Sequence, residues 1–307
     1  MYRKYKGWKD YMSDCTLCPR ECHADRLHGI LGYCMEPAAV TAARAALHFW
    51  EEPCISGECG SGTVFFSGCN LRCVFCQNHE IARGKAGKEI TVERLAEIFL
   101  ELQEKGAANI NLVTPTHYVP QIVEALKQAG EQGLMLPVVY NCGGYEKVET
   151  LRLLEGYVDI YLPDFKYMKS ETALRYSKAA DYPQRAKEAV EEMVRQVGSP
   201  RFCEETGLMQ KGVVVRHLVL PGHVKEAGTI LRYLHETYGN RIYLSIMNQY
   251  TPLAGVEYFP EINRKVTKRE YEAVLSVAVD CGVENGFFQE GDTAKESFIP
   301  PFSGEGI

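Results

Sequence analysis

Short apolar runs alternate along this chain with stretches in which apolar residues recur every three to four positions. The runs have the length and β-branched content of buried strands, whereas the stretches have the spacing of amphipathic helices. Strands that alternate with helices predict parallel strands joined by helical crossovers. The six predicted strands cover residues 62–67, 110–113, 137–140, 158–162, 213–220 and 242–246.

The helical stretches carry start and stop signals. Thr91 caps the first, which Gly106 ends. Asp181 and Pro183 are expected to break a long helical region at 170–197 into two, and Thr267 begins a last helix with the capping-box pattern. The remaining helices are expected over residues 122–130, 148–154 and 225–237. Six strand–helix units fit a partial barrel or a doubly wound sheet equally well.

Polar or glycine-rich residues follow most of the predicted strands. Because parallel strands bring their carboxyl ends to one edge, these residues are expected to form the rim of a ligand site. After a cysteine-rich loop come Thr114-Pro115-Thr116-His117, Asn141-Cys142-Gly143-Gly144, Pro163-Asp164-Phe165-Lys166, Pro221-Gly222-His223 and Met247-Asn248-Gln249-Tyr250, with Arg216 inside the fifth strand.

The loop after the first strand holds three cysteines, Cys69, Cys73 and Cys76, spaced C-x3-C-x2-C. Three thiolates can hold three irons of a 4Fe–4S cubane and leave the fourth open, whereas four cysteines would saturate it. An open iron indicates chemistry rather than electron storage. The alternatives are a partial zinc site or an ordinary iron–sulfur site.

Composition narrows the class of protein. A length of 307 residues with 46% hydrophobic content suits one large globular domain or a barrel with a small appendage. A net charge of −6 without a long basic block argues against a nucleic-acid partner. No apolar run reaches membrane-spanning length, and residues 1–6 are charged without a hydrophobic stretch behind them, so we expect no signal peptide. Twelve cysteines then predict metal ligands and reduced thiols in a cytoplasmic protein.

The cysteine loop and the strand ends resemble the radical S-adenosylmethionine (SAM) superfamily, in its pyruvate formate-lyase activating enzyme branch. The resemblance implies an α/β fold, a partial (β/α)6 barrel over residues 61–307 preceded by a cysteine-rich segment over 1–60. It implies an oxidoreductase whose 4Fe–4S cluster binds SAM and cleaves it reductively to a 5′-deoxyadenosyl radical that abstracts hydrogen. It also implies an external electron donor of flavodoxin or ferredoxin type.

The same resemblance implies roles for single residues. Phe75 stands where the family places a ring against adenine, Asp164 and Lys166 look like its Asp-x-Lys element, and Arg216 looks like its strand-five arginine. Taken from the residues alone, Arg216 could instead pair with a neighbouring carboxylate, and Asp164 with Lys166 could be a solvated turn pair. The residues expected to contact SAM are Phe75, Asn78, Thr114, Asn141, Asp164, Lys166 and Arg216.

Two departures separate the chain from that branch. Residues 114–117 replace its usual Gly-Gly-Glu, and Tyr250 stands where a histidine usually follows strand six. The chain looks most like a sister group that shares a Cys-Pro-Arg leader and the stretch His48-Phe49-Trp50-Glu51-Glu52-Pro53.

The sequence does not identify the substrate. A polypeptide, such as a glycyl-radical enzyme, would need an open barrel mouth, and we expect the residues after Phe288 to be too few to plug it. A small-molecule substrate and a non-enzymatic, zinc-stapled binding module are the alternatives.

A second cysteine group lies near the N-terminus, and its segment has too few apolar residues to fold alone, so a metal is expected to stabilise it. Zinc and a second iron–sulfur cluster both fit. The group comprises Cys15, Cys18, Cys22 and Cys34. Cys54 and Cys59, before the first strand, could be ligands, redox-active thiols or neither. The isolated Cys142, Cys203 and Cys281 are expected to be small buried hydrophobes, and His117, His217 and His223 to be structural.

Overall fold

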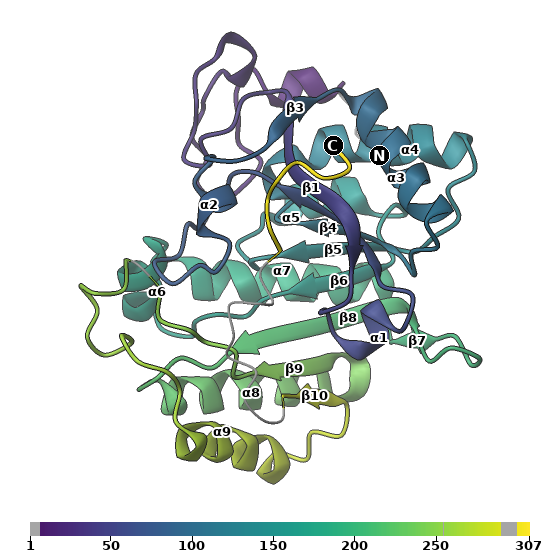
Figure 1. Cartoon of the computed structure of the whole chain (residues 1–307). Coiled ribbons are helices and arrows are strands. Elements are labelled where there is room, and N and C mark those ends of the chain that lie inside the picture. The colour runs from purple at the N-terminus through teal and green to yellow at the C-terminus, as the bar shows by residue number, and fades with distance from the viewer. Residues whose placement is uncertain (1–6, 254, 290–299) are drawn as a thin grey trace.

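The computed structural model describes residues 7–253, 255–289 and 300–307. Residues 1–6, on which the signal-peptide expectation rests, lie outside these ranges. In the described part, ten strands form one sheet in the order β3–β1–β2–β4–β5–β6–β8–β9–β10, with β7 beside β8. Figure 1 shows the sheet with its helices on the outer side.

The strands are β1 (Val40–His48), β2 (Ser61–Phe66), β3 (Lys88–Ile90), β4 (Ile110–Val113), β5 (Val138–Cys142), β6 (Ile160–Pro163), β7 (Arg201–Phe202), β8 (Met209–Leu218), β9 (Tyr243–Met247) and β10 (Gly286–Phe288). The α-helices are α1 (Pro53–Ser56), α2 (His79–Ala82), α3 (Val92–Glu104), α4 (Val119–Glu131), α5 (Val148–Leu151), α6 (Ser170–Ser177), α7 (Tyr182–Val197), α8 (Val224–Tyr238) and α9 (Lys268–Asp280). Short 3-10 helices cover Trp8–Tyr11, Arg26–His28, Thr116–Tyr118, Arg152–Leu154 and Gly239–Arg241.

The parallel core confirms the predicted architecture. The strands β2, β4, β5, β6, β8 and β9 pair in parallel and correspond to the six predicted strands. Thr91 accepts a hydrogen bond from the Arg94 N–H, and Thr267 forms the capping box with Glu270. The long helical region breaks as expected, with Pro183 in the first turn of α7. Local signals therefore placed most of these elements correctly.

The antiparallel strands β1 and β3 were not predicted. The Ala-rich sequence of β1 lacks a strict alternation of apolar and polar residues, because both of its faces are largely buried. His48 of β1 pairs with Ser61 of β2, so these residues join the main sheet although they fall within the segment 1–60. The division at residue 60 remains a prediction.

The C-terminal residues 300–307 lie along β1. The Gly304 N–H donates to the Ala43 carbonyl at 3.0 Å, and the Ala45 N–H donates to the Glu305 carbonyl at 2.8 Å. The Phe302 ring meets the Phe65 ring edge-on at 5.5 Å. This segment therefore lies over β1 on one side of the sheet (Figure 1), and its residue Pro300 lines the pocket described below. No helix in the described ranges is long and apolar enough to cross a membrane.

Candidate active site

The three-cysteine loop follows the carboxyl end of β2. Gly68 opens it with a φ of +81°, and a Cβ there would lie 2.8 Å from the Cys34 carbonyl oxygen, so only glycine fits. The Cys69 Sγ accepts hydrogen bonds from the backbone N–H groups of residues 71 and 72, at 3.3 and 3.5 Å. The Ser177 hydroxyl donates to the Cys73 Sγ at 2.9 Å. Such donors stabilise thiolate ligands of a cluster.

The three thiols form one electrostatic group. Burial, together with the neighbouring thiols of Cys69 and Cys73, raises the pKa of Cys76 to about 12. Burial also raises the pKa of Cys69, with Cys73 adding to it. Because a ligand thiol must lose its proton, this site would release protons when it takes up iron. A buried set of thiols with hydrogen-bond donors fits the three-thiolate side of a 4Fe–4S cluster.

A single metal ion would need a different arrangement of ligands from that of a cluster. Among the residues that the structure describes, no three His, Cys, Asp or Glu side chains crowd around one point as a lone metal ion requires. In a cubane, each thiolate binds a different iron.

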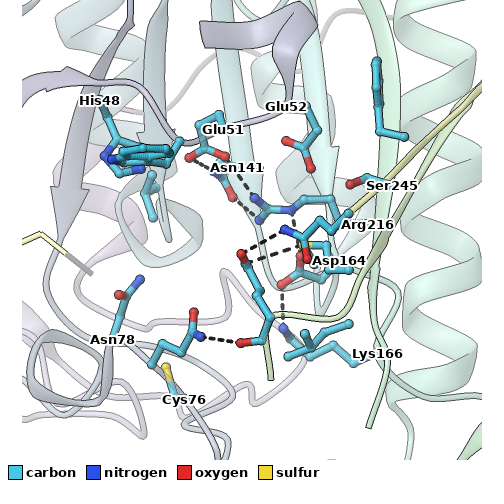
Figure 2. A pocket seen from close by; sticks show the side chains of 18 of the residues that line it. His48, Glu51, Glu52, Cys76, Asn78, Asn141, Asp164, Lys166, Arg216 and Ser245 are labelled. Carbon is cyan, nitrogen blue, oxygen red and sulfur yellow. Dashed lines mark hydrogen bonds and ion pairs between the residues drawn. The ribbon is translucent and has the colours of Figure 1, made fainter. Parts of the chain in front are cut away.

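A pocket of about 540 Å³ opens beside this loop. Six of the seven residues expected to contact SAM line it, together with two of the cysteines. They are Phe75, Asn78, Asn141, Asp164, Lys166 and Arg216, with Cys73 and Cys76. Figure 2 shows their side chains converging from the cysteine loop and from β5, β6 and β8. The tertiary fold thus gathers residues that lie far apart in the sequence.

A charged network forms the wall of the pocket. Lys166 Nζ lies 2.5 Å from Asp164 Oδ2, and Arg216 Nε lies 2.9 Å from Asp164 Oδ1. Arg216 also donates to Glu51 Oε2 at 3.1 Å and to Asn141 Oδ1 at 2.6 Å. Asp164 and Lys166 are therefore not a solvated turn pair, because both side chains are less than a fifth exposed. Arg216 pairs with neighbouring carboxylates and faces the pocket as well.

The network holds opposite charges in their ionised states. Burial raises the pKa of Asp164, but the charges of Lys166 and Arg216 outweigh burial and leave this pKa below its usual value. Burial lowers the pKa of Lys166, but Asp164 and the Cys73 thiol reverse the shift and raise it overall. An ammonium group beside Cys73 and Cys76 gives this end of the pocket a positive charge that suits an anionic ligand group.

Phe75 lies in an aromatic cluster at the cysteine loop. Its ring is 5% exposed and meets the rings of Tyr167, Tyr176 and Tyr250 at centroid distances of 6.5, 6.3 and 5.9 Å. Tyr250, which stands in place of the expected histidine, also donates to the Ile262 carbonyl at 2.8 Å. Tyr250 therefore supports the Phe75 ring.

The segment 114–117 turns away from the pocket. Thr116 donates to Glu146 Oε1 at 2.8 Å, and His117 Nε2 lies 2.6 Å from the Ser67 carbonyl oxygen. Burial raises the pKa of Glu146 to about 7. Thr114 is absent from the described residues that line the pocket, so its contact with SAM remains a prediction without support from this geometry.

The N-terminal thiols interact electrostatically. Burial is the main cause of the raised pKa of Cys18, and the thiols of Cys34, Cys15 and Cys22 contribute to the same shift. Arg26 is 1% exposed and donates to Cys15 Sγ at 3.8 Å. In the described part of the chain Arg26 donates to three backbone carbonyl oxygens and forms no ion pair, although the buried Glu36 carboxyl lies near enough to interact with its charge.

Arg20 of the Cys-Pro-Arg leader braces the cluster loop. Its side chain donates to the Asn70 carbonyl and to the Ser177 carbonyl, each at 2.9 Å. Tyr33 stacks under the Arg20 guanidinium at 4.0 Å and donates to the Leu71 carbonyl. The leader and the three-cysteine loop are therefore packed together.

The remaining cysteines and histidines have structural surroundings. Cys142 is buried, Cys203 and Cys281 are half-buried, and Cys54 packs in a small apolar cluster, whereas Cys59 is exposed. His217 Nδ1 lies 2.7 Å from the Phe165 carbonyl, and His223 Nε2 lies 3.0 Å from the Tyr176 hydroxyl. None of these residues lines the pocket in the described part of the molecule.

Among the pocket residues that were not predicted are Glu51, Glu52 and Ser245. The only signal for the two acids was their place in the stretch His48–Pro53, which the sequence did not connect with any strand end. They precede β2, whereas the rule used for prediction considers residues that follow strands.

The chain was compared with known proteins. The family model described as "Radical SAM superfamily" matches residues 63–234, more than half of the chain. An uncharacterized protein of Methanocaldococcus jannaschii is 29% identical over 88% of this chain and 75% of its own length. A pyruvate formate-lyase-activating enzyme of Clostridium pasteurianum is 27% identical over 35% of this chain and 46% of its own length.

Among solved structures, Streptococcus suis SuiB bound to its precursor peptide SuiA aligns with a TM-score of 0.50 at 15% identity. That alignment covers 72% of this chain but only 46% of the SuiB chain, so this chain spans about half of SuiB. At this identity the likeness shows the fold alone. The fold, the three-cysteine loop at the end of β2 and the family match agree, and the chain belongs to the radical SAM superfamily.

Proposed function

We propose that this protein uses a 4Fe–4S cluster and SAM to abstract hydrogen from a polypeptide substrate. The supporting observation is that a three-thiol loop and the network of Asp164, Lys166 and Arg216 line one pocket. When bound, the cluster and SAM supply a reductive cleavage that yields a 5′-deoxyadenosyl radical. Cys69, Cys73 and Cys76 would hold the cluster.

The protein's own side chains bind and orient the ligands. Lys166 offers a cation beside the cysteines, and Asp164 holds both Lys166 and Arg216 in place. Asn141 fixes the Arg216 guanidinium from β5 and offers polar groups to the pocket. The Phe75 ring provides an apolar surface on which an adenine base can stack.

A polypeptide substrate has support from the pocket's rim and from the relatives. Trp50 and Phe288 line the pocket and are 65% and 58% exposed, and exposed aromatic side chains are common where proteins bind peptides. The SuiB structure holds a precursor peptide, and the Clostridium relative is named for activating a protein. Activation of a glycyl-radical enzyme is the finer version of this proposal.

Deuterium transfer tests the proposal. Extract from cells grown in deuterated medium would be separated into polypeptide and small-molecule fractions and incubated anaerobically with the reconstituted, reduced protein and SAM. We expect 5′-deoxyadenosine to gain deuterium from the polypeptide fraction, as read by mass spectrometry, and Cys73→Ala to give none. Label from the small-molecule fraction alone would exclude a polypeptide substrate.

We also propose that Cys15, Cys18, Cys22 and Cys34 hold a second metal centre, either zinc or an iron–sulfur cluster. No three of the described thiols surround one point as a single ion requires, so zinc would need these side chains to move together when it binds. The thiols interact electrostatically, and Tyr33 N–H donates to Cys22 Sγ at 3.2 Å. A bound tetrathiolate centre would add negative charge beside the buried Arg26.

Removal of Cys18 and Cys22 together should release one metal centre and lower the melting temperature, because that centre contributes folding energy to its segment. Iron at Cys69, Cys73 and Cys76 should remain. Metal and sulfide analysis distinguishes zinc from iron, and a Cys59→Ser/Cys203→Ser double variant is the matched control. If the cluster iron is lost as well, the two centres are coupled through Arg20, and our separation of them is wrong.

A further inference from the structure

The loop between β1 and β2 reaches into the interior of the barrel. It ends in α1, whose residues Cys54 and Ile55 pack against buried apolar residues of β5, β6 and β8. The Glu51 N–H donates to Ser56 Oγ at 3.1 Å and the Ile55 N–H donates to the Glu52 carbonyl at 2.8 Å, which fix the loop. Both acids of this loop consequently line the pocket (Figure 2).

The two carboxylates have different surroundings. Glu51 accepts hydrogen bonds from Arg216 at 3.1 Å, Asn111 at 3.3 Å and Asn141 at 3.1 Å, so both of its oxygens are occupied. Glu52 is 8% exposed, and its buried Oε2 has no hydrogen-bond partner among the described residues. The Arg216 charge and the Ser245 hydroxyl both favour the ionised form of this carboxyl group. Arg216 donates a hydrogen bond to Glu51 but none to Glu52, so Glu52 meets Arg216 through charge alone and keeps a buried oxygen without a donor among the described residues.

The cations of the pocket are already engaged. Arg216 directs its donors to Asp164, Glu51 and Asn141, and Lys166 is paired with Asp164. His48, which also lines the pocket, has its pKa lowered to about 4 by burial and by Arg44, so it is neutral at pH 7. The described lining therefore has three carboxyl groups and two side-chain cations, and Glu52 is the acid to which neither cation donates a hydrogen bond. Burial raises the pKa of Glu52, and a bound cation would stabilise its charged form.

Glu52 and the cluster loop approach the pocket from different elements. The cluster loop follows Phe66 at the carboxyl end of β2, whereas Glu52 belongs to the loop that precedes Ser61. In Figure 2 the Glu52 carboxylate lies on the far side of Arg216 from Cys76 and Lys166. The Arg216 side chain thus separates Glu52 from a ligand anchored at the cysteines, which leaves the Glu52 carboxylate to a second ligand.

We propose that Glu52 is a specificity-determining residue that binds a positively charged nitrogen of the substrate, an alkylammonium or guanidinium group. This rests on the function proposed above and narrows it. For a polypeptide, the group is a lysine or arginine side chain entering from the rim at Trp50 and Phe288. Ser245 beside the carboxylate adds one hydroxyl to the same subsite.

Matched peptides test the proposal without the natural substrate. Three short capped peptides that differ only in a central lysine, arginine or norleucine would be titrated against the reconstituted, SAM-bound protein under anaerobic conditions, with NMR line broadening as the readout. A charge-assisted pair predicts that a cationic peptide binds the wild type about tenfold or more tightly than the norleucine peptide. In Glu52→Gln this ratio should fall toward one, whereas exposed Glu58→Gln should retain it.

Several outcomes would overturn the proposal. If the wild type binds all three peptides equally, the proposal is wrong, and this result does not depend on whether a variant folds. The proposal is also wrong if Glu52→Gln keeps the preference for cationic peptides. A tenfold loss of SAM affinity in Glu52→Gln would contradict it too, because Glu52 would then bind SAM. The choice between the lysine and arginine peptides identifies the cation. The binding experiment does not require SAM to be cleaved. If the wild type fails to cleave SAM, that result contradicts the proposed function but not the proposed role of Glu52.

Discussion

Alanine at Cys69, Cys73 or Cys76 is expected to abolish reductive cleavage of SAM. Each thiolate anchors one iron of the cluster, and the Cys69 and Cys73 sulfurs also accept the hydrogen bonds that tune a cluster's potential. The measurement is formation of 5′-deoxyadenosine by the anaerobically reconstituted, reduced protein, alongside iron and sulfide content. We expect full loss of product and at least partial loss of iron.

The control is Cys281→Ala at the carboxyl end of α9, a position remote in sequence from both cysteine groups and absent from the described pocket lining. It should retain both product and iron. A Cys73→Ala protein that still forms 5′-deoxyadenosine would show that this loop is not the cluster site. A colourless wild type with zinc at both cysteine groups would support the non-enzymatic alternative instead.

Arg216→Ala is expected to lower the free energy of unfolding by about 3–5 kcal/mol, the range for removing one partner of a buried ion pair. The side chains of Arg216, Glu51 and Asp164 are only 15%, 9% and 18% exposed, so solvent screens the loss weakly. Removing the guanidinium leaves both carboxylates without their shared cation. Urea denaturation of the full chain measures this effect.

The same variant should bind SAM more weakly by roughly 1–3 kcal/mol if the guanidinium contacts SAM, the range for a charge-assisted hydrogen bond. Calorimetric titration measures it. Arg195→Ala is the matched control, because Arg195 also pairs with two carboxylates but is 49% exposed, and it should change stability by less than about 1 kcal/mol. If Arg216→Ala destabilises the fold but binds SAM normally, Arg216 has a structural role only.

The prediction of pocket residues was correct for residues at or just after the end of a strand. Asn141 is the penultimate residue of β5, and Asp164 and Lys166 follow β6 closely, so the rule that parallel strands share one edge was enough to bring them to one pocket. Thr114 obeyed the same rule but does not line the pocket. Its backbone takes a φ of +58°, and the 3-10 helix at Thr116–Tyr118 carries the segment toward the Ser67 carbonyl.

The alternation of strands and helices, the helix caps and the cluster loop could all be predicted from the amino-acid sequence, because each depends on residues within a few positions of one another. The place of β1, the packing of Arg20 against Asn70 and the entry of Glu51 and Glu52 into the pocket became apparent in the folded structure alone. These contacts join residues distant in the chain, and their geometry depends on how the antiparallel strand and the loop after it fold back onto the parallel core. The local pattern of apolar and polar residues does not predict such long-range contacts.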